Sequence, residues 1–286
     1  MHDTGSRDEQ ALAPREGDAP PFRTLWGLTR HTAGAGIAGV ATGLVVGGVG
    51  GRLLMRAAGA AARDAAQGAT TEAGFHVGEI TFGGTLALVL FIGIFSGVAG
   101  AVYYLIFLRW LGWAGRWRGL VFGVVLFGAT SATSDMLNPD NPDFVILRNE
   151  TLLVGLIVVL FLSFGVLIDW LFGVLNTRLP PAEARYDPAR FLYASLTCFG
   201  LLLASPVPML LFGRSSCDCQ PPVIASAFVT AAAVATVLWW LTCLLPRPPR
   251  VLSRVAPLLG YLGVGGTVAF GLTRATSDIA AIVTRF

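Results

Sequence analysis

The chain is divided into apolar blocks of about twenty residues separated by short polar loops, and this pattern constrains the fold most strongly. A helix needs about 20 apolar residues to cross a hydrocarbon core about 30 Å thick. Only 13% of the 286 residues are charged, whereas soluble domains have about 25%. A β-barrel would instead show short segments of alternating polarity. The sequence therefore predicts an all-α, polytopic membrane helix bundle in contact with the lipid bilayer.

About seven blocks have the length of a transmembrane helix. They are predicted at 33–56, 81–108, 119–136, 151–175, 191–212, 223–245 and 257–283. Residues 1–32 are polar, mixed in charge and contain Pro14, Pro20 and Pro21, which predicts a disordered cytoplasmic tail. In the fifth block, Pro206 and Pro208 remove backbone donors and predict a break or kink.

One polar sequence occurs twice. Phe127–Asp135 reads FGATSATSD, and Phe270–Asp278 reads FGLTRATSD, so seven of nine positions match. We interpret this as a parallel internal duplication of three helices, one connecting helix and three helices. The first three-helix repeat is then 33–136 and the second is 191–286. Residues 137–190 form an acidic outer loop, the connecting helix and a linker.

The basic residues set the predicted orientation. All twenty are Arg, and the absence of Lys excludes Schiff-base and P-loop chemistry. The tail has four Arg, and the loops after the second, fourth and sixth blocks have three each, against four on the other side. The positive-inside rule places the N-terminus in the cytoplasm and the C-terminus outside. Arg residues spread over loops in this way do not indicate nucleic-acid binding.

This orientation brings several charged residues to the outer ends of the helices. Charges beside the hydrocarbon region are costly unless they are paired. We therefore predict a polar cluster, with Arg274 paired to Asp278 or to Asp135, that binds a ligand or holds the helices in register. The predicted members are Arg52, Arg56, Asp135, Arg274 and Asp278. The first copy of the repeat has Ser131 where the second has Arg274.

Glycine recurs every four residues in the first block, at Gly39, Gly43, Gly47 and Gly51. Small residues at this spacing let two membrane helices approach closely. The partner is either another helix of the same subunit or a second copy in a homo-oligomer. Gly93, Gly97 and Gly100 form a further close-approach face in the second block.

Motifs for chemistry are few. The sequence has no H-E-x-x-H, no paired-Cys metal spacing and no G-x-S-x-G. We therefore predict no catalytic residue, no metal site, no cofactor and no enzymatic activity. The turn-rich loop Asn138–Asp143 offers side-chain oxygens to a cation or simply forms turns, and Cys217 and Cys219 have no assigned role.

Three segments together resemble an uncharacterised family of bacterial, chiefly actinobacterial, multi-pass membrane proteins. They are Gly50–Arg56, Gly78–Leu86 and Asp140–Phe144. The resemblance covers roughly residues 35–180 and implies a bacterial plasma membrane, but it implies no activity, substrate or catalytic residue.

Two functions follow as hypotheses. The first is a small-solute permease or channel, because three-one-three parallel repeats occur in small transporters. The alternative is a non-enzymatic membrane scaffold or assembly protein of the cell envelope. A cavity between the two repeats would favour the permease, and a continuous apolar core would count against it. A third hypothesis is a membrane-embedded enzyme acting on lipid, which would need an acid, base or nucleophile facing a lipid-accessible groove, with Asp135 and Asp278 as candidates.

Overall fold

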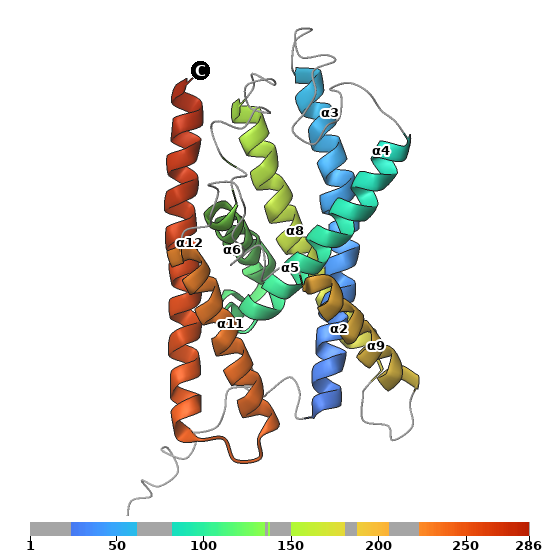
Figure 1. The fold of residues 1–286 in the computed structure, drawn as a ribbon, viewed down its shortest axis with the longest axis vertical. Helices are drawn as coiled ribbons and strands as arrows, with labels where there is room; N and C mark the ends of the chain where they lie inside the picture. The colour runs from blue at the N-terminus through green and yellow to red at the C-terminus, as the bar shows by residue number, and fades with distance from the viewer. Residues whose placement is uncertain are drawn as a thin grey trace, which may run out of the picture.

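The chain forms a bundle of helices in the computed structural model, which describes residues 24–61, 82–134, 137, 150–180, 188–205 and 223–285 (Figure 1). No strand occurs in these ranges, so the predicted all-α class is confirmed. Five helices are long and apolar enough to cross a membrane: Leu25–Ala57, Val89–Phe107, Thr151–Arg178, Val223–Leu244 and Arg250–Thr284.

Several helices contain short stretches of non-α geometry. The first continues from α2 (Leu25–Thr42) through a π-helical segment, η2 (Gly43–Gly50), into α3 (Gly51–Ala61). The second joins α4 (Phe82–Ala87), the π-helical η4 (Leu88–Ile92) and α5 (Gly93–Phe107). A 3-10 segment, η5 (Gly112–Trp117), leads into α6 (Arg118–Thr133).

The remaining helices are α8 (Glu150–Arg178), α9 (Pro188–Ala204), α11 (Val223–Leu244) and α12 (Arg250–Arg285). With 16 residues in α6 and 17 in α9, these two are shorter than the five membrane-spanning candidates. The positions of all these helices agree with the predicted blocks, while the count of seven membrane crossings stays a prediction.

Three helix ends differ from the predicted ones by seven residues or more. Helix α2 begins at Leu25, inside the predicted tail, because the Thr24 hydroxyl accepts a hydrogen bond from the Gly27 N–H at 3.1 Å and caps the helix. Helix α12 begins at Arg250, before the predicted start at 257, and contains Pro257.

Helix α9 ends at Ala204, just before Ser205-Pro206, in keeping with the restriction that proline places on the preceding residue. Several sequence predictions fall outside the described residues. They concern residues 1–23, Asp135, the loop Asn138–Asp143, the pair Pro206 and Pro208, and the pair Cys217 and Cys219.

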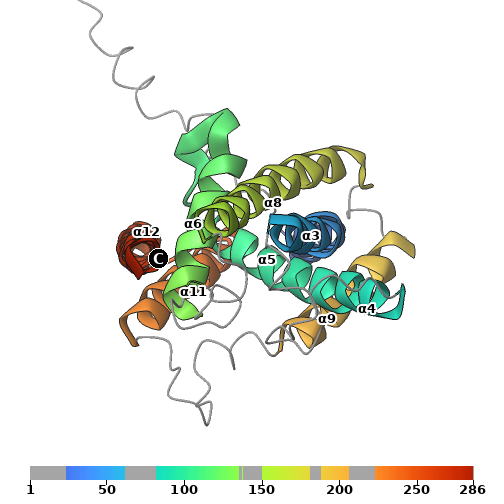
Figure 2. The same ribbon diagram turned by 90° about the horizontal axis from the view of Figure 1, so that it is seen from above.

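The long helices run between two ends of the bundle. We call the end where α2 begins and α11 ends the lower end, and the end where α12 finishes the upper end (Figure 1). Helix α8 runs antiparallel to α2, because Gly34 lies beside Phe172 and Gly50 beside Leu160. Seen from above, α3 and α12 lie on opposite sides, with α5, α6 and α8 between them (Figure 2).

One apolar core extends through six helices. It joins buried side chains of α2, α5, α6, α8, α11 and α12, and its members include Ala38, Phe107, Phe122, Ile168, Ala235 and Val264. A second core near the upper end joins α6, α8 and α12 through Phe127, Leu153, Val154, Ala275 and Ile282. Apolar side chains from the two halves of the chain, which carry the two copies of the repeat, therefore pack against one another.

Glycines permit the closest helix contacts. A Cβ at Gly39 would lie 2.5 Å from the Ala101 Cβ, and one at Gly43 would overlap the backbone of Gly93 and Gly97. Gly47 lies against Ser96, whereas Gly51 has no atom within 4 Å of an added Cβ. Three of these four regularly spaced glycines thus pack on α5 in the same subunit.

Candidate functional site: a polar cluster at the lower end

Three polar side chains from different helices meet near the lower end of the bundle. The Asp169 carboxylate of α8 accepts a hydrogen bond from the Tyr104 hydroxyl of α5 at 2.6 Å. The same oxygen accepts from the Arg118 Nε of α6 at 2.7 Å. We call these three residues the inner cluster. Its charge-assisted bonds tie α5, α6 and α8 together where each helix is surrounded by apolar neighbours.

A glycine brings the two charged partners together. A Cβ at Gly119 would lie 2.9 Å from the Asp169 Cβ and 2.9 Å from the Gly165 carbonyl oxygen. The start of α6 therefore approaches α8 more closely than any larger residue allows. This approach places the Arg118 side chain, one residue earlier, beside the carboxylate.

Aromatic rings enclose one side of the inner cluster. Tyr104 is fully buried and makes edge contacts with Phe122 and Phe172, with ring centroids 5.1 and 5.4 Å apart. His31 of α2 also meets Phe172 edge-on at 5.1 Å. The charged pair is less enclosed, because the side chains of Arg118 and Asp169 remain 32% and 18% exposed. The cluster thus has a buried tyrosine side and a side open to its surroundings.

A second polar arrangement fixes the end of α8. Arg30 of α2 donates to the carbonyl oxygens of Asn176, Leu179 and Pro180 at 2.6, 2.9 and 3.0 Å. Carbonyls at a helix C-terminus lack intrahelical partners and carry partial negative charge. A guanidinium there donates the missing hydrogen bonds and neutralises the partial charge. Arg30 therefore acts as a C-cap supplied by another helix.

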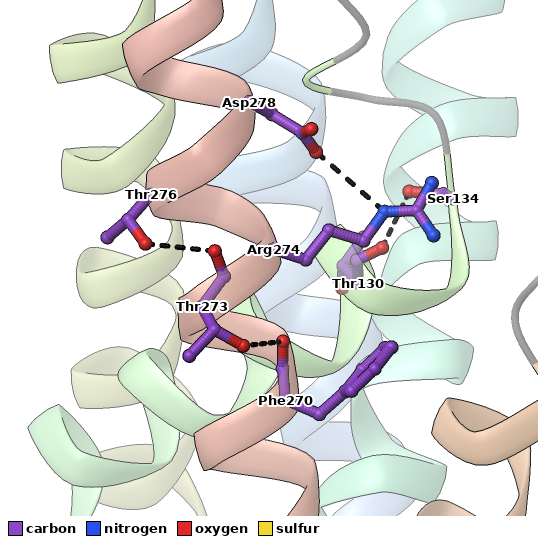
Figure 3. A network of polar contacts seen from close by, with 7 residues as sticks. All are labelled: Thr130, Ser134, Phe270, Thr273, Arg274, Thr276 and Asp278. Atoms are coloured by element: carbon purple, nitrogen blue, oxygen red, sulfur yellow. Dashed lines mark hydrogen bonds and ion pairs between the residues drawn. The ribbon is translucent and has the colours of Figure 1, made fainter.

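The predicted outer residues lie at the upper end. Arg274 and Asp278, one turn apart on α12, form an ion pair with 3.8 Å between Nε and Oδ2. In Figure 3 the Arg274 side chain points from α12 toward the end of α6, where Ser134 donates to the Thr130 carbonyl oxygen at 2.8 Å. This arrangement places a cation near the C-terminus of α6, where the helix dipole favours it.

The other predicted members are less closely placed. Arg52 and Arg56 lie on α3, and Arg56 is exposed. The Arg52 Nε is buried without a hydrogen-bond partner in the described part of the chain. Asp135 lies outside that part. The Arg274–Asp278 pair is therefore present, while the gathering of all five residues into one cluster stays a prediction.

The two copies of the repeated sequence pack on each other. A Cβ at Gly271 of α12 would overlap the carbonyl group of Gly128 in α6. Gly128 and Gly271 occupy the same position in the two copies, directly after Phe127 and Phe270. The helices run in the same direction, because Trp110, just before α6, contacts Gly260 near the start of α12.

The inner cluster was not predicted from the sequence. Asp169 is the one acidic residue within the apolar stretch 151–175, and this was the available signal, since ionisable residues within membrane helices are usually paired or functional. Arg118 had been assigned to a topology-determining loop.

The inner cluster offers a carboxylate, a guanidinium and a phenol, so it can hold helices together or exchange hydrogen bonds with a polar ligand. In the described ranges, no group of three or more His, Cys, Asp or Glu side chains is placed to hold a metal ion. Comparison of the chain with protein-family models, with curated proteins and with solved structures finds no match.

Proposed function

We propose that the protein is a non-enzymatic scaffold or assembly protein embedded in a bacterial plasma membrane. The observation that carries this proposal is the apolar core, which joins α2, α5, α6, α8, α11 and α12 without interruption. A conduit for a polar solute needs a polar path between its helices, and the core where these helices meet is built from buried aliphatic and aromatic side chains. The resemblance to multi-pass membrane proteins supports the bacterial membrane.

The proposed topology has seven crossings, with the N-terminus in the cytoplasm and the C-terminus outside. Two observations support it. The start of α2 and the end of α12 lie at opposite ends of the bundle (Figure 1), as an odd number of crossings requires. Arg30, Arg109, Arg118, Arg178 and Arg250 all lie at the lower end, the side that the positive-inside rule assigns to the cytoplasm.

A parallel duplication accompanies this topology. It is supported by the contact between Gly128 and Gly271 and by the common direction of α6 and α12. The two halves differ in their internal packing, however. Helix α6 packs mainly on the following helix, α8, whereas α12 packs mainly on the preceding helix, α11. Under this proposal the two copies came to pack on different neighbouring helices, while the contact between α6 and α12 was kept.

A small-solute permease is the second candidate, and the inner cluster favours it. Ionisable residues inside membrane proteins mark many substrate and proton pathways, and Asp169 connects three helices that a transport cycle would have to separate. In this alternative the apolar core belongs to a closed state.

Reconstitution separates the two candidates. Purified protein in liposomes should release protons, potassium, amino acids and sugars no faster than protein-free liposomes do. In mild detergent, the protein from its native membrane should elute in a complex of fixed stoichiometry. Saturable flux that is lost in Asp169→Asn, with unchanged elution of the variant, would overturn the scaffold and establish the permease.

A further inference from the structure

All seven Trp residues lie toward the lower end of the bundle. They are Trp26 at the start of α2, Trp110, Trp113 and Trp117 between α5 and α6, Trp170 in the second half of α8, and Trp239 and Trp240 near the end of α11. Tryptophan prefers the interface between the hydrocarbon core and water, and membrane proteins commonly carry it at both interfaces. In this bundle all seven lie toward one end, where Trp110 is buried in the core and the other six are not.

Arginine follows the same asymmetry. Among the described residues, those at the lower end are Arg30, Arg109, Arg116, Arg118, Arg178, Arg190, Arg247, Arg250 and Arg254. The described acidic residues are Glu150, Asp169 and Asp278, and of these only Asp169 lies toward the lower end, where it is already bonded to Arg118. The described part of this end is therefore strongly positive.

Three of these arginines lie over tryptophan rings. The guanidinium carbon is 5.3 Å from the ring centroid in Arg116–Trp117, 5.3 Å in Arg190–Trp26 and 5.2 Å in Arg109–Trp239. We call these the Arg–Trp pairs. Stacking on an aromatic face holds a guanidinium in a fixed orientation. Less conformational entropy is then lost when its N–H groups bind an oxyanion. Each pair therefore places a positive charge directly beside an indole ring.

The segment η5 presents the most exposed of these pairs. None of its residues is buried, and Trp113 and Trp117 are 71% and 56% exposed. Gly115 has a φ of 50°, a conformation that glycine adopts without the strain that a Cβ would bring. This turn places Arg116 and Trp117 outside the packed bundle.

We propose that the Arg–Trp pairs bind the phosphate groups of anionic phospholipids in the leaflet at the lower end, with Arg116 and Trp117 as the most accessible site. The charge of this end complements an anionic headgroup, and guanidinium binds phosphate through two parallel hydrogen bonds. The stacked indole gives the lipid an apolar surface beside the charge. Inorganic phosphate would gain nothing from the ring, so the pairing favours a lipid over that ion.

The test is lipid retention in native mass spectrometry. Protein reconstituted into liposomes of equal parts phosphatidylglycerol and phosphatidylcholine is extracted in mild detergent, and the retained lipids are counted. Wild type should retain phosphatidylglycerol in preference. Arg116→Gln should lower this preference about fivefold, the effect of one basic residue at an anionic surface. Trp117→Leu should lower it as well, without changing the melting temperature, because η5 buries no residue.

Arg178→Gln is the matched control. Arg178 is exposed at the end of α8 and is stacked over no ring in the described part of the chain, yet the substitution removes the same charge. It should change the preference less than Arg116→Gln does. If both variants lowered the preference for phosphatidylglycerol equally, general surface charge would explain lipid binding, and the proposal would be overturned. Equal retention of the two lipids by wild type, or loss of phosphatidylglycerol on adding inorganic phosphate, would overturn it too.

Discussion

Replacing Gly271 by Ala should destabilise the protein far more than replacing Gly128, although the two glycines occupy the same position in the repeated sequence. A Cβ at Gly271 would lie 2.7 Å from the Gly128 Cα and closer still to its carbonyl group. These are backbone atoms of a helix, so no side chain can rotate away. At Gly128, the nearest atoms to an added Cβ are 3.7 Å or more away.

The magnitude follows from these distances. Carbon atoms pack at about 3.5–4.0 Å, so a methyl group at position 271 must move α12 from α6 by about 1 Å. A gap of that size forfeits a quarter to a half of each contact across the interface, and overpacking costs typically 1–3 kcal/mol. We expect Gly271→Ala to cost about 3 kcal/mol. Gly128→Ala meets ordinary contacts and gains about 1 kcal/mol of helix propensity.

Unfolding in mixed micelles of mild and denaturing detergent, followed by circular dichroism, measures both variants against wild type. Gly271→Ala should unfold at a lower fraction of denaturing detergent, and Gly128→Ala at the wild-type fraction or above it. Equal shifts for the two variants would refute the reasoning, because they would place the helix crossing elsewhere than at these glycines.

Two further predictions concern the inner cluster and the contact between α2 and α5. Asp169→Asn removes the charge that Arg118 neutralises, and, since both side chains are partly exposed, it should cost about 2–3 kcal/mol rather than the larger cost of a fully buried pair. Tyr104→Phe leaves that ion pair intact and should cost about 1–2 kcal/mol, so detergent unfolding of both variants should rank them in this order. Gly97→Leu would press against the Val40 Cα, 2.8 Å from the new Cβ, and should abolish the single folded peak in size-exclusion chromatography. Gly36→Leu, with no atom within 4 Å of its new Cβ, is the matched control and should retain that peak.

The sequence predicted the helices well because the length of each apolar block is set by membrane thickness, independently of what the block packs on. Individual ends were less predictable. The start of α2 depends on the cap at Thr24 and on Arg30, whose partners lie at the end of α8 and directly after it. The contacts of Arg30 are long-range and cannot be read from local patterns, whereas the Thr24 cap is a local feature.

The polar residues were predicted unevenly for a related reason. Arg274 and Asp278 form their ion pair within one helix turn, so spacing alone indicated it. The inner cluster needs Tyr104, Arg118 and Asp169 at the same depth on three helices, which sequence order does not reveal. The glycine spacing indicated a close approach and favoured a helix of the same subunit as the partner, with a second copy as the alternative.

The C-cap that Arg30 supplies to α8 also sets an order of events during synthesis. Its acceptors lie 146 to 150 residues downstream, which translation at about 5–20 residues per second produces only after roughly 7–30 s. Until then the first helix must wait with a hydrated arginine at its lower end, free to shift in the bilayer. The hydrogen bonds of Arg30 can form only when the end of α8 has been synthesised. The position of the first helix in the bilayer is therefore fixed after more than half of the chain has been made.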